Sequence, residues 1–141
     1  MKKIVILFFF LLSTFNSFSQ LDSSFFFNLS PYSATFYGQA QVDGLSADSN
    51  DFIGAFDSLG ICVGSVQLLV NNNIAYINLV IYGDDPNTLN IDEGLTSMEN
   101  FYLKLFDYSE SQIFDYPSFD SIYSFSGWQN NNGAPLPDYN S

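Results

Sequence analysis

Six oxygen-bearing side chains crowd one segment of the sequence, GDDPNTLNIDEGLTSMEN, residues 83–100. They are Asp84, Asp85, Asn87, Asn90, Asp92 and Glu93. Carboxylate and amide oxygens in a flexible loop are the ligands that calcium takes, so these six residues are the candidate calcium ligands. The spacing departs from an EF-hand, because Leu89 stands where a third oxygen ligand is needed and Asn90 stands where glycine is needed. The alternative interpretation is a solvated loop in an acidic protein.

Aromatic side chains offer a second kind of chemistry, because a ring with an apolar face and a polar edge suits stacking against a sugar. The candidate stacking residues are Trp128, Tyr76, Tyr82 and Tyr102, with Tyr37 and Tyr108 as further exposed rings. The alternative is that these rings cover a sheet face or contact a neighbouring module. Trp128 lies in an Asn- and Gly-rich tail, which favours an anchor for a linker over a sugar platform.

Catalysis has little support in the sequence, which contains no histidine. A Ser-His or Cys-His pair, a histidine base and a typical zinc site are therefore all excluded. Asp84 or Asp85 paired with Asp92 or Glu93 could in principle hydrolyse a glycoside, but these carboxylates share one loop of a small domain. A Ser-Lys pair would depend on Lys104, which falls inside an expected strand. We expect a protein that is not an enzyme.

The glycine-rich stretch NDFIGAFDSLGICVG, residues 50–64, predicts a hairpin and not a phosphate-binding loop. A phosphate-binding loop would lead into a helix and often carry a lysine, and neither is present. Gly60 lies in the connection, where a positive φ is often needed. Gly54 and Gly64 fall inside the strands, where glycine marks a bulge or the close approach of a ring or another backbone.

The elements that would position these residues are strands, because Phe, Tyr, Val, Ile and Thr are abundant. Apolar and polar residues alternate strictly in several segments. In the clearest one, Ala34, Phe36 and Ala40 share one face while Thr35 and Gln39 share the other. Strands are predicted at residues 33–42, 51–56, 61–69, 73–83, 100–107, 112–116 and 122–125, and at an edge over residues 25–29.

About seven or eight short strands with evenly spaced turns predict an all-β fold, an antiparallel immunoglobulin-like β-sandwich. A small barrel or jelly roll is the competing architecture. Cys62 is the one cysteine, so the chain has no internal disulfide, and we expect Cys62 to be a small buried hydrophobe.

The N-terminus has the features of a secretory signal peptide, residues 1–19. Lys2 and Lys3 precede an apolar run over residues 4–12, and small residues follow at Ser17 and Ser19. A helix that spans a bilayer needs about 20 apolar residues, and this run is shorter, so we expect no membrane insertion after cleavage. The remaining domains are a β-sandwich over residues 20–126 and an Asn-, Gly- and Pro-rich tail or linker over residues 127–141.

Cleavage would leave Lys104 as the only basic residue beside 15 acidic ones. Nucleic acid is excluded as a partner, because phosphate contacts rely on lysine and arginine. Binding to an anionic membrane surface is excluded for the same reason. A strongly acidic surface favours solubility and attracts cations.

Several short motifs follow one another in a recognisable order. They are residues 42–44 (VDG), 51–56 (DFIGAF), 62–64 (CVG), 83–85 (GDD) and 101–107 (FYLKLFD). Over residues 33–108 this order resembles an immunoglobulin-like module of secreted, multidomain surface proteins of Bacteroidota-type bacteria, often associated with type IX secretion. The resemblance implies an extracellular, non-enzymatic β-sandwich that sits beside other modules.

Together these features predict a secreted or cell-surface module that acts in adhesion or as a structural spacer, with other surface modules or an extracellular glycan as its partner. The alternative function is a carbohydrate-binding module, with calcium as its cofactor in a calcium-dependent version.

Overall fold

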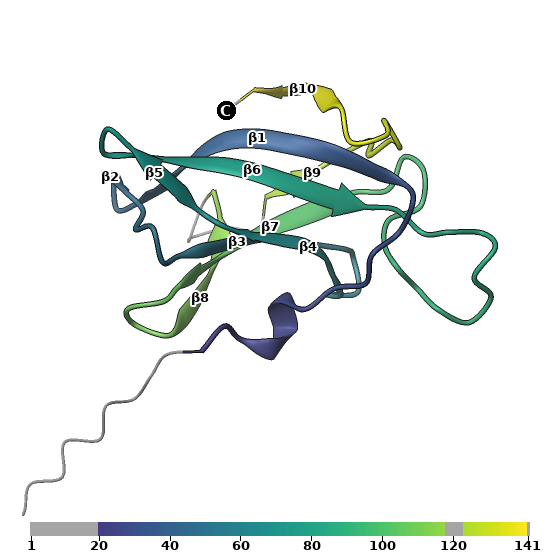
Figure 1. The fold of residues 1–141 in the computed structure, drawn as a ribbon, viewed down its shortest axis with the longest axis horizontal. Coiled ribbons are helices and arrows are strands. Elements are labelled where there is room, and N and C mark those ends of the chain that lie inside the picture. Colours follow the sequence, from purple (N-terminus) through teal and green to yellow (C-terminus); the bar gives the residue numbers. More distant parts are fainter. Residues whose placement is uncertain (1–19, 118–122, 141) are drawn as a thin grey trace, which may run out of the picture.

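The computed structural model describes residues 20–117 and 123–140. The expected signal peptide, residues 1–19, and residue 122 of an expected strand lie outside the described residues. The described chain is all-β apart from a short 3-10 turn, η1 (Ser23–Phe25), and folds into two stacked sheets (Figure 1). The strands are β1 (Ser33–Val42), β2 (Leu45–Ser46), β3 (Phe52–Phe56), β4 (Cys62–Gln67), β5 (Leu69–Asn71), β6 (Ile74–Tyr82), β7 (Phe101–Asp107), β8 (Gln112–Tyr116), β9 (Ser124–Phe125) and β10 (Pro135–Asn140).

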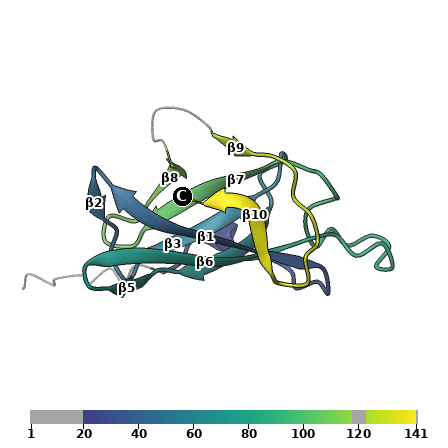
Figure 2. The same cartoon turned by 90° about the horizontal axis from the view of Figure 1, so that it is seen from above.

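Sheet 1 has the strand order β10-β1-β6-β5, with β2 paired to the end of β1. Its centre is the long antiparallel pair of β1 and β6, in register from Ser33 opposite Tyr82 to Ala40 opposite Ala75. On the other edge of β1, β10 adds a parallel strand. Figure 2 shows β5 and β6 on one side of the molecule and β8 and β9 on the other.

Sheet 2 has the strand order β4-β3-β7-β8. Every pair in it is antiparallel, and the outer edge of β7 is shared by two short strands. β8 pairs with β7 from Leu103 to Asp107, and β9 pairs with Phe101 and Tyr102. The prediction of an all-β fold in which two mainly antiparallel sheets pack together is therefore confirmed.

The main core lies between the sheets and consists of the residues that alternation placed on the inner faces. Phe36 of β1 and Leu79 of β6 are 2% and 0% exposed, and Leu105 of β7 is 0% exposed. Aromatic rings close one end of the core, where Phe101 and Phe125 stack with centroids 5.2 Å apart. The periodicity of the sequence therefore predicted these inward faces correctly, because the inner face of each sheet is buried against the other sheet.

A second, smaller apolar cluster lies on the outer face of sheet 2, under the N-terminal segment. The prediction of an edge strand over residues 25–29 is wrong, because η1 stands at its start and no strand follows before β1. The Asp22 carboxylate accepts the N–H of Ser24 at 2.8 Å and bends the chain there. The turn delivers Phe25 onto Gly54, with the Phe25 and Phe56 rings edge to face at 5.2 Å.

The predicted hairpin of residues 50–64 is confirmed as β3 and β4. Gly60 in the connection has a φ of +83°, as expected of its place in the turn. A Cβ on Gly64 would collide with the backbone carbonyl of Val80, so this glycine lets β4 touch β6 of the opposite sheet. Both strand glycines thus have the packing role that the sequence predicted, Gly54 under a ring and Gly64 against a backbone.

Residues 127–140, expected to form a tail or linker, contribute to the sandwich. Trp128 is 3% exposed and Leu136 is 6% exposed, and β10 pairs with β1. The backbone N–H groups of Asn131 and Gly133 donate to the carbonyl of Ser33 at 3.0 and 2.9 Å. The sheet therefore continues past residue 126, because two large apolar side chains in a segment rich in Asn, Gly and Pro dock on the body of the fold.

Candidate functional site

The acidic segment forms a loop, residues 83–95, that projects from one end of the sandwich between β6 and β7 (Figure 1). Backbone hydrogen bonds close its base. The N–H of Leu95 donates to the carbonyl of Tyr82 at 3.0 Å, and the N–H of Asp84 donates to the carbonyl of Leu95 at 3.0 Å. A Cβ on Gly94 would collide with the Tyr82 carbonyl, so the closure requires glycine there. Backbone hydrogen bonds thus hold the two ends of the loop close together.

Two of the predicted calcium ligands hold the backbone of this loop. Asp85 Oδ1 accepts the backbone N–H of Asn87 at 2.9 Å and the side-chain amide of Asn87 at 2.8 Å. Asp92 Oδ1 accepts the N–H of Gly94 at 3.2 Å. These are the local turns that Asp and Asn side chains form with residues two positions ahead. The carboxylates therefore have a structural task that needs no metal.

Asp84 and Glu93 form a carboxyl pair near the base of the loop. Glu93 is 6% exposed, and its Oε2 lies 3.4 Å from the backbone N–H of Asp85. Hydrogen bonding from Thr88 lowers the pKa of Glu93 despite burial, with smaller contributions from Asp85 and Asp84. The pKa of Asp84 is raised, first by desolvation and then by Glu93. Asp84 therefore holds a proton more readily than an ordinary aspartate does, whereas Glu93 gives its proton up more readily than an ordinary glutamate does.

The predicted ligands do not converge on one point. Within residues 20–117 and 123–140, no three Asp, Glu, Cys or His side chains gather closely enough to hold a metal ion. Asp84, Asp85, Asn90 and Asp92 line a shallow hollow of about 390 Å³, together with residues of the same loop. Leu89 is 82% exposed at this surface. The loop geometry thus favours the solvated-loop interpretation over an assembled calcium site.

The four candidate stacking aromatics lie in different parts of the molecule. Trp128 is 3% exposed, with its ring against Gly83, so it offers no platform. Tyr82 is half-buried under Phe27, whose ring stacks on it at 5.4 Å. Tyr76 is 38% exposed on the outer face of sheet 1, whereas Tyr102 is half-buried on sheet 2. The four residues therefore do not form one surface.

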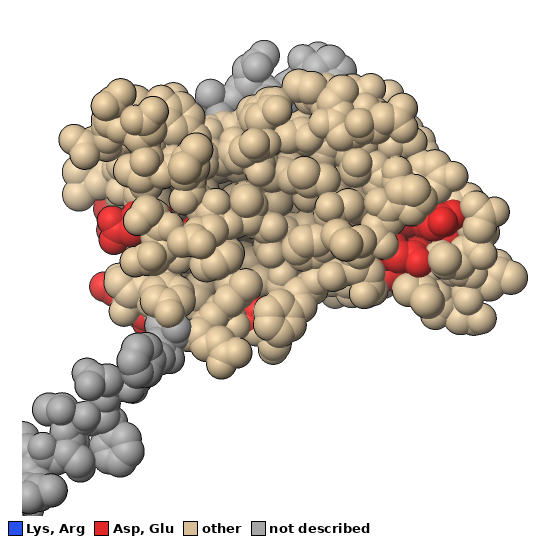
Figure 3. Space-filling view, viewed as in Figure 1, with Lys and Arg blue, Asp and Glu red and all other residues tan. Residues whose placement is uncertain are grey.

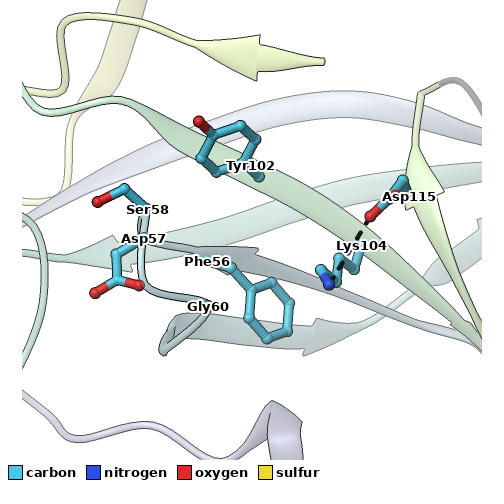
Figure 4. A pocket seen from close by; sticks show the side chains of 7 residues that line it. All are labelled: Phe56, Asp57, Ser58, Gly60, Tyr102, Lys104 and Asp115. Atoms are coloured by element: carbon cyan, nitrogen blue, oxygen red, sulfur yellow. Dashed lines mark ion pairs between the residues drawn. The ribbon is translucent and has the colours of Figure 1, made fainter. Parts of the chain in front are cut away.

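Tyr102 lines a pocket of about 260 Å³ on the outer side of sheet 2, shown in Figure 4. The other lining residues are Phe56, Asp57, Ser58, Gly60, Lys104 and Asp115. The Lys104 ammonium lies 5.4 Å from the Phe56 ring centroid and 3.9 Å from Asp115 Oδ1, so it is already paired. An ion pair this exposed contributes little to stability, at most about 1 kcal/mol.

The Asp57 carboxylate of this pocket belongs to the hairpin connection. Its Oδ1 accepts the N–H groups of Leu59 at 2.9 Å and Ile61 at 2.7 Å, and the side chain is 6% exposed. Two backbone donors on one oxygen fix the turn that forms one wall of the pocket. Asp57 therefore stabilises one wall of the pocket.

A larger hollow of about 510 Å³ lies beside the acidic loop. Tyr32, Asp84, Thr96, Trp128 and Asn130 are among its lining residues. The indole N–H of Trp128 has no hydrogen-bond partner among the described residues, but the atom is itself shut off from solvent. A ligand in the hollow would not reach that N–H without moving the ring.

The outer face of sheet 1 is a surface that the sequence revealed only in part. Tyr37, 47% exposed, faces Asn78 across the β1-β6 pair, and Tyr76 lies between Gln39 of β1 and Leu69 of β5. Alternation identified the polar face of each strand, but the register that joins these side chains is a tertiary feature. All outward residues of the three strands are uncharged, namely Ser33, Thr35, Tyr37, Gln39, Gln41, Leu69, Asn71, Ile74, Tyr76, Asn78, Val80 and Tyr82.

Comparison with known proteins gives no relative, because no family, no curated protein and no solved structure matches the chain. The described residues contain no helix with the length and apolar character needed to cross a bilayer.

Proposed function

We propose that the chain is a non-catalytic, exported β-sandwich module of immunoglobulin-like type that works at the cell surface, in adhesion or as a spacer between other modules. The leader pattern of residues 1–19 and the resemblance over residues 33–108 support export and a surface location. The two-sheet architecture supports the assignment as a module, because a β-sandwich presents loops and sheet faces to partners.

The observation that carries the proposal is the use made of the acidic side chains. In eight acidic residues of the described chain, carboxylate oxygens accept backbone N–H groups of turns and strand ends. These residues are Asp22, Asp51, Asp57, Asp85, Asp92, Glu93, Glu99 and Asp107. A carboxylate that is fixed as an acceptor for the backbone is poorly suited to act as a general acid or base, so this chemistry supports a structural or binding role.

A carbohydrate-binding module is the second candidate function. The specific observation in its favour is the exposed, uncharged face that carries Tyr37 and Tyr76. Tyrosine rings beside amide side chains offer both stacking and hydrogen bonds to a hydroxyl-rich partner.

An adhesion assay tests the first proposal. Beads coated with residues 20–141 are exposed to cells or to surface material of the producing organism, and retained beads are counted after washing. We expect retention above that of beads coated with an unrelated acidic β-sandwich. Polysaccharide hydrolysis by the same preparation, lost in Asp92→Asn, would contradict a non-catalytic function. Failure of the coated beads to bind, without hydrolysis, would leave the spacer as the surviving form of the proposal.

A further inference from the structure

We propose that the outer face of sheet 1 formed by Tyr37, Gln39, Leu69, Tyr76 and Asn78, here called the tyrosine face, binds an uncharged polysaccharide chain. The inference rests on the second candidate function and assigns to it a site and a class of ligand. The remaining candidates are weaker, because the acidic loop uses its carboxylates internally and the Figure 4 pocket has its cation already paired.

The tyrosine face is placed by the pairing of three strands. Gln39 faces Tyr76, and Tyr76 faces Leu69, so these three side chains form a row across β1, β6 and β5. Tyr37 faces Asn78 in the next outward row. Tyr37 and Tyr76 are therefore diagonal neighbours on one face, about 7–8 Å apart at the backbone. The antiparallel pair of β1 and β6 thus presents both tyrosines on one face.

The side chains on this face combine two kinds of contact. Tyr37 is 47% exposed and Tyr76 is 38% exposed, so ring surface is open to a ligand. Asn78 is also exposed, and an amide both donates and accepts hydrogen bonds. Sugar units have apolar C–H surfaces and hydroxyl groups, which match a ring flanked by amides. The chemistry of the face therefore fits a carbohydrate better than an apolar peptide.

The charges of the protein determine which class of carbohydrate the tyrosine face can bind. Every outward residue of β1, β5 and β6 is uncharged, in a chain with 15 acidic residues. Figure 3 shows acidic side chains at the end of the molecule that carries the loop between β6 and β7, and near the opposite end, with a broad area between them that is almost free of acidic side chains. The field of the acidic protein repels a polyanion, and the face has no carboxylate for a cation. An uncharged polysaccharide is not repelled by the acidic protein and does not need a carboxylate on the face.

The same field opposes a second copy of the protein as the occupant. Two copies that met through this face would bring two strongly acidic bodies together, which costs electrostatic free energy at low salt. A neutral glycan carries no such cost. The occupant that the charge distribution favours is therefore the glycan.

The test uses residues 20–141 and a panel of soluble uncharged polysaccharides, such as glucans, mannans and galactans, in affinity electrophoresis. The variants are Tyr37→Ala, Tyr76→Ala, the double variant, Tyr102→Ala at the pocket of Figure 4, and Tyr123→Ala as the matched control at an exposed tyrosine outside both places. Thermal melts confirm that each variant is folded. We expect at least one glycan to retard the protein, each single change on the face to weaken binding about tenfold, and the double change to abolish it. Tyr123→Ala and added salt should change little.

Three outcomes overturn the inference, and they are distinguishable. Binding lost in Tyr102→Ala and kept in the tyrosine-face variants would leave a carbohydrate-binding module but move its site to the pocket of Figure 4. Absence of binding by the whole panel would reject both the site and the second candidate function, while the bead assay would still test adhesion. Sedimentation that shows a dimer dissolved by Tyr37→Ala and Tyr76→Ala would make the face an interface between copies.

Discussion

The indole ring of Trp128 lies against the Cα of Gly83, so that any Cβ at position 83 would collide with the Cη2 atom of the ring. Gly83 directly follows β6, and Trp128 comes from the segment before β10. The contact therefore attaches the C-terminal part of the chain to the long central strand of sheet 1. It also explains why Trp128 is buried in a segment rich in Asn and Gly.

Replacement of Gly83 by alanine should displace the indole ring and destabilise the fold. We expect Gly83→Ala to lower the free energy of unfolding by about 2–3 kcal/mol, as overpacking does in close-packed interiors. Urea titration followed by the fluorescence of Trp128, the only tryptophan, measures it. Ser49→Ala, at an exposed turn, is the control and should change little. An unchanged midpoint in Gly83→Ala would refute the packing of Trp128 on Gly83.

Cys62 should be inert in the folded protein. It is 4% exposed, and burial raises the pKa of its thiol to about 11. At pH 8 only about one thiol in a thousand would then be ionised, and the thiolate is the reactive form. We expect a thiol reagent to label the native chain at least a hundredfold more slowly than the chain in denaturant. Rapid labelling under native conditions would place Cys62 at the surface and contradict the second apolar cluster.

Asp51 should make stability depend on pH. Its carboxylate is 3% exposed and accepts the N–H groups of Asp48 at 2.8 Å and Tyr108 at 3.0 Å. Desolvation is the main cause that raises the pKa of Asp51 above its ordinary value of 3.8. The folded state therefore binds a proton at Asp51 more readily than the unfolded chain does. The stability from this group is full below pH 3.8 and is lost as the pH rises through the raised folded pKa.

Comparison of Asp51→Asn with the wild type over that pH range isolates the effect. We expect the variant to lose this part of the pH dependence, and to lose about 1–2 kcal/mol of stability at pH 7 because an amide can accept only one of the two N–H groups in the same way. Glu110→Gln removes an exposed charge and should keep the wild-type profile. An identical pH profile in Asp51→Asn would show that another group is responsible.

Calcium should leave the stability unchanged. Asp85 and Asp92 already accept N–H groups of their own loop, and no three acidic side chains of the described chain converge there. We expect thermal melts in millimolar calcium and in a chelator to agree within about 1 °C, because a ligand stabilises only by binding the folded state. A calcium-dependent rise of the midpoint that disappears in Asp85→Asn would establish the metal site that the sequence alone predicted.

The sequence predicted the parts of the fold that depend on local patterns. The alternation of β1 and β6 indicated that Ala34 and Ile77 face inward, and the hairpin connection placed Gly60 correctly. The docking of Trp128 and β10 was not predictable, because an Asn-, Gly- and Pro-rich segment has the composition of a linker. Its burial depends on the space above Gly83, which only the tertiary structure provides.

The candidate site shows the same division. The type and outward position of Tyr76 make it a candidate stacking residue, and its side chain is exposed. Tyr82 has the same outward position but lies under Phe27, which comes from a segment that the sequence predicted as an edge strand. The oxygen-rich composition of the loop indicated calcium chemistry, but the direction of Asp85 and Asp92 toward backbone N–H groups is a property of the folded loop.

The most direct measurement combines binding and turnover in one tube. Residues 20–141 are immobilised and incubated with a soluble uncharged polysaccharide, and both the retained glycan and newly formed reducing ends are quantified. We predict retention that falls in Tyr37→Ala and Tyr76→Ala, with no reducing ends above those of a protein-free control. Reducing ends that accumulate with time and disappear in Asp92→Asn would contradict a module that holds its partner without chemical change.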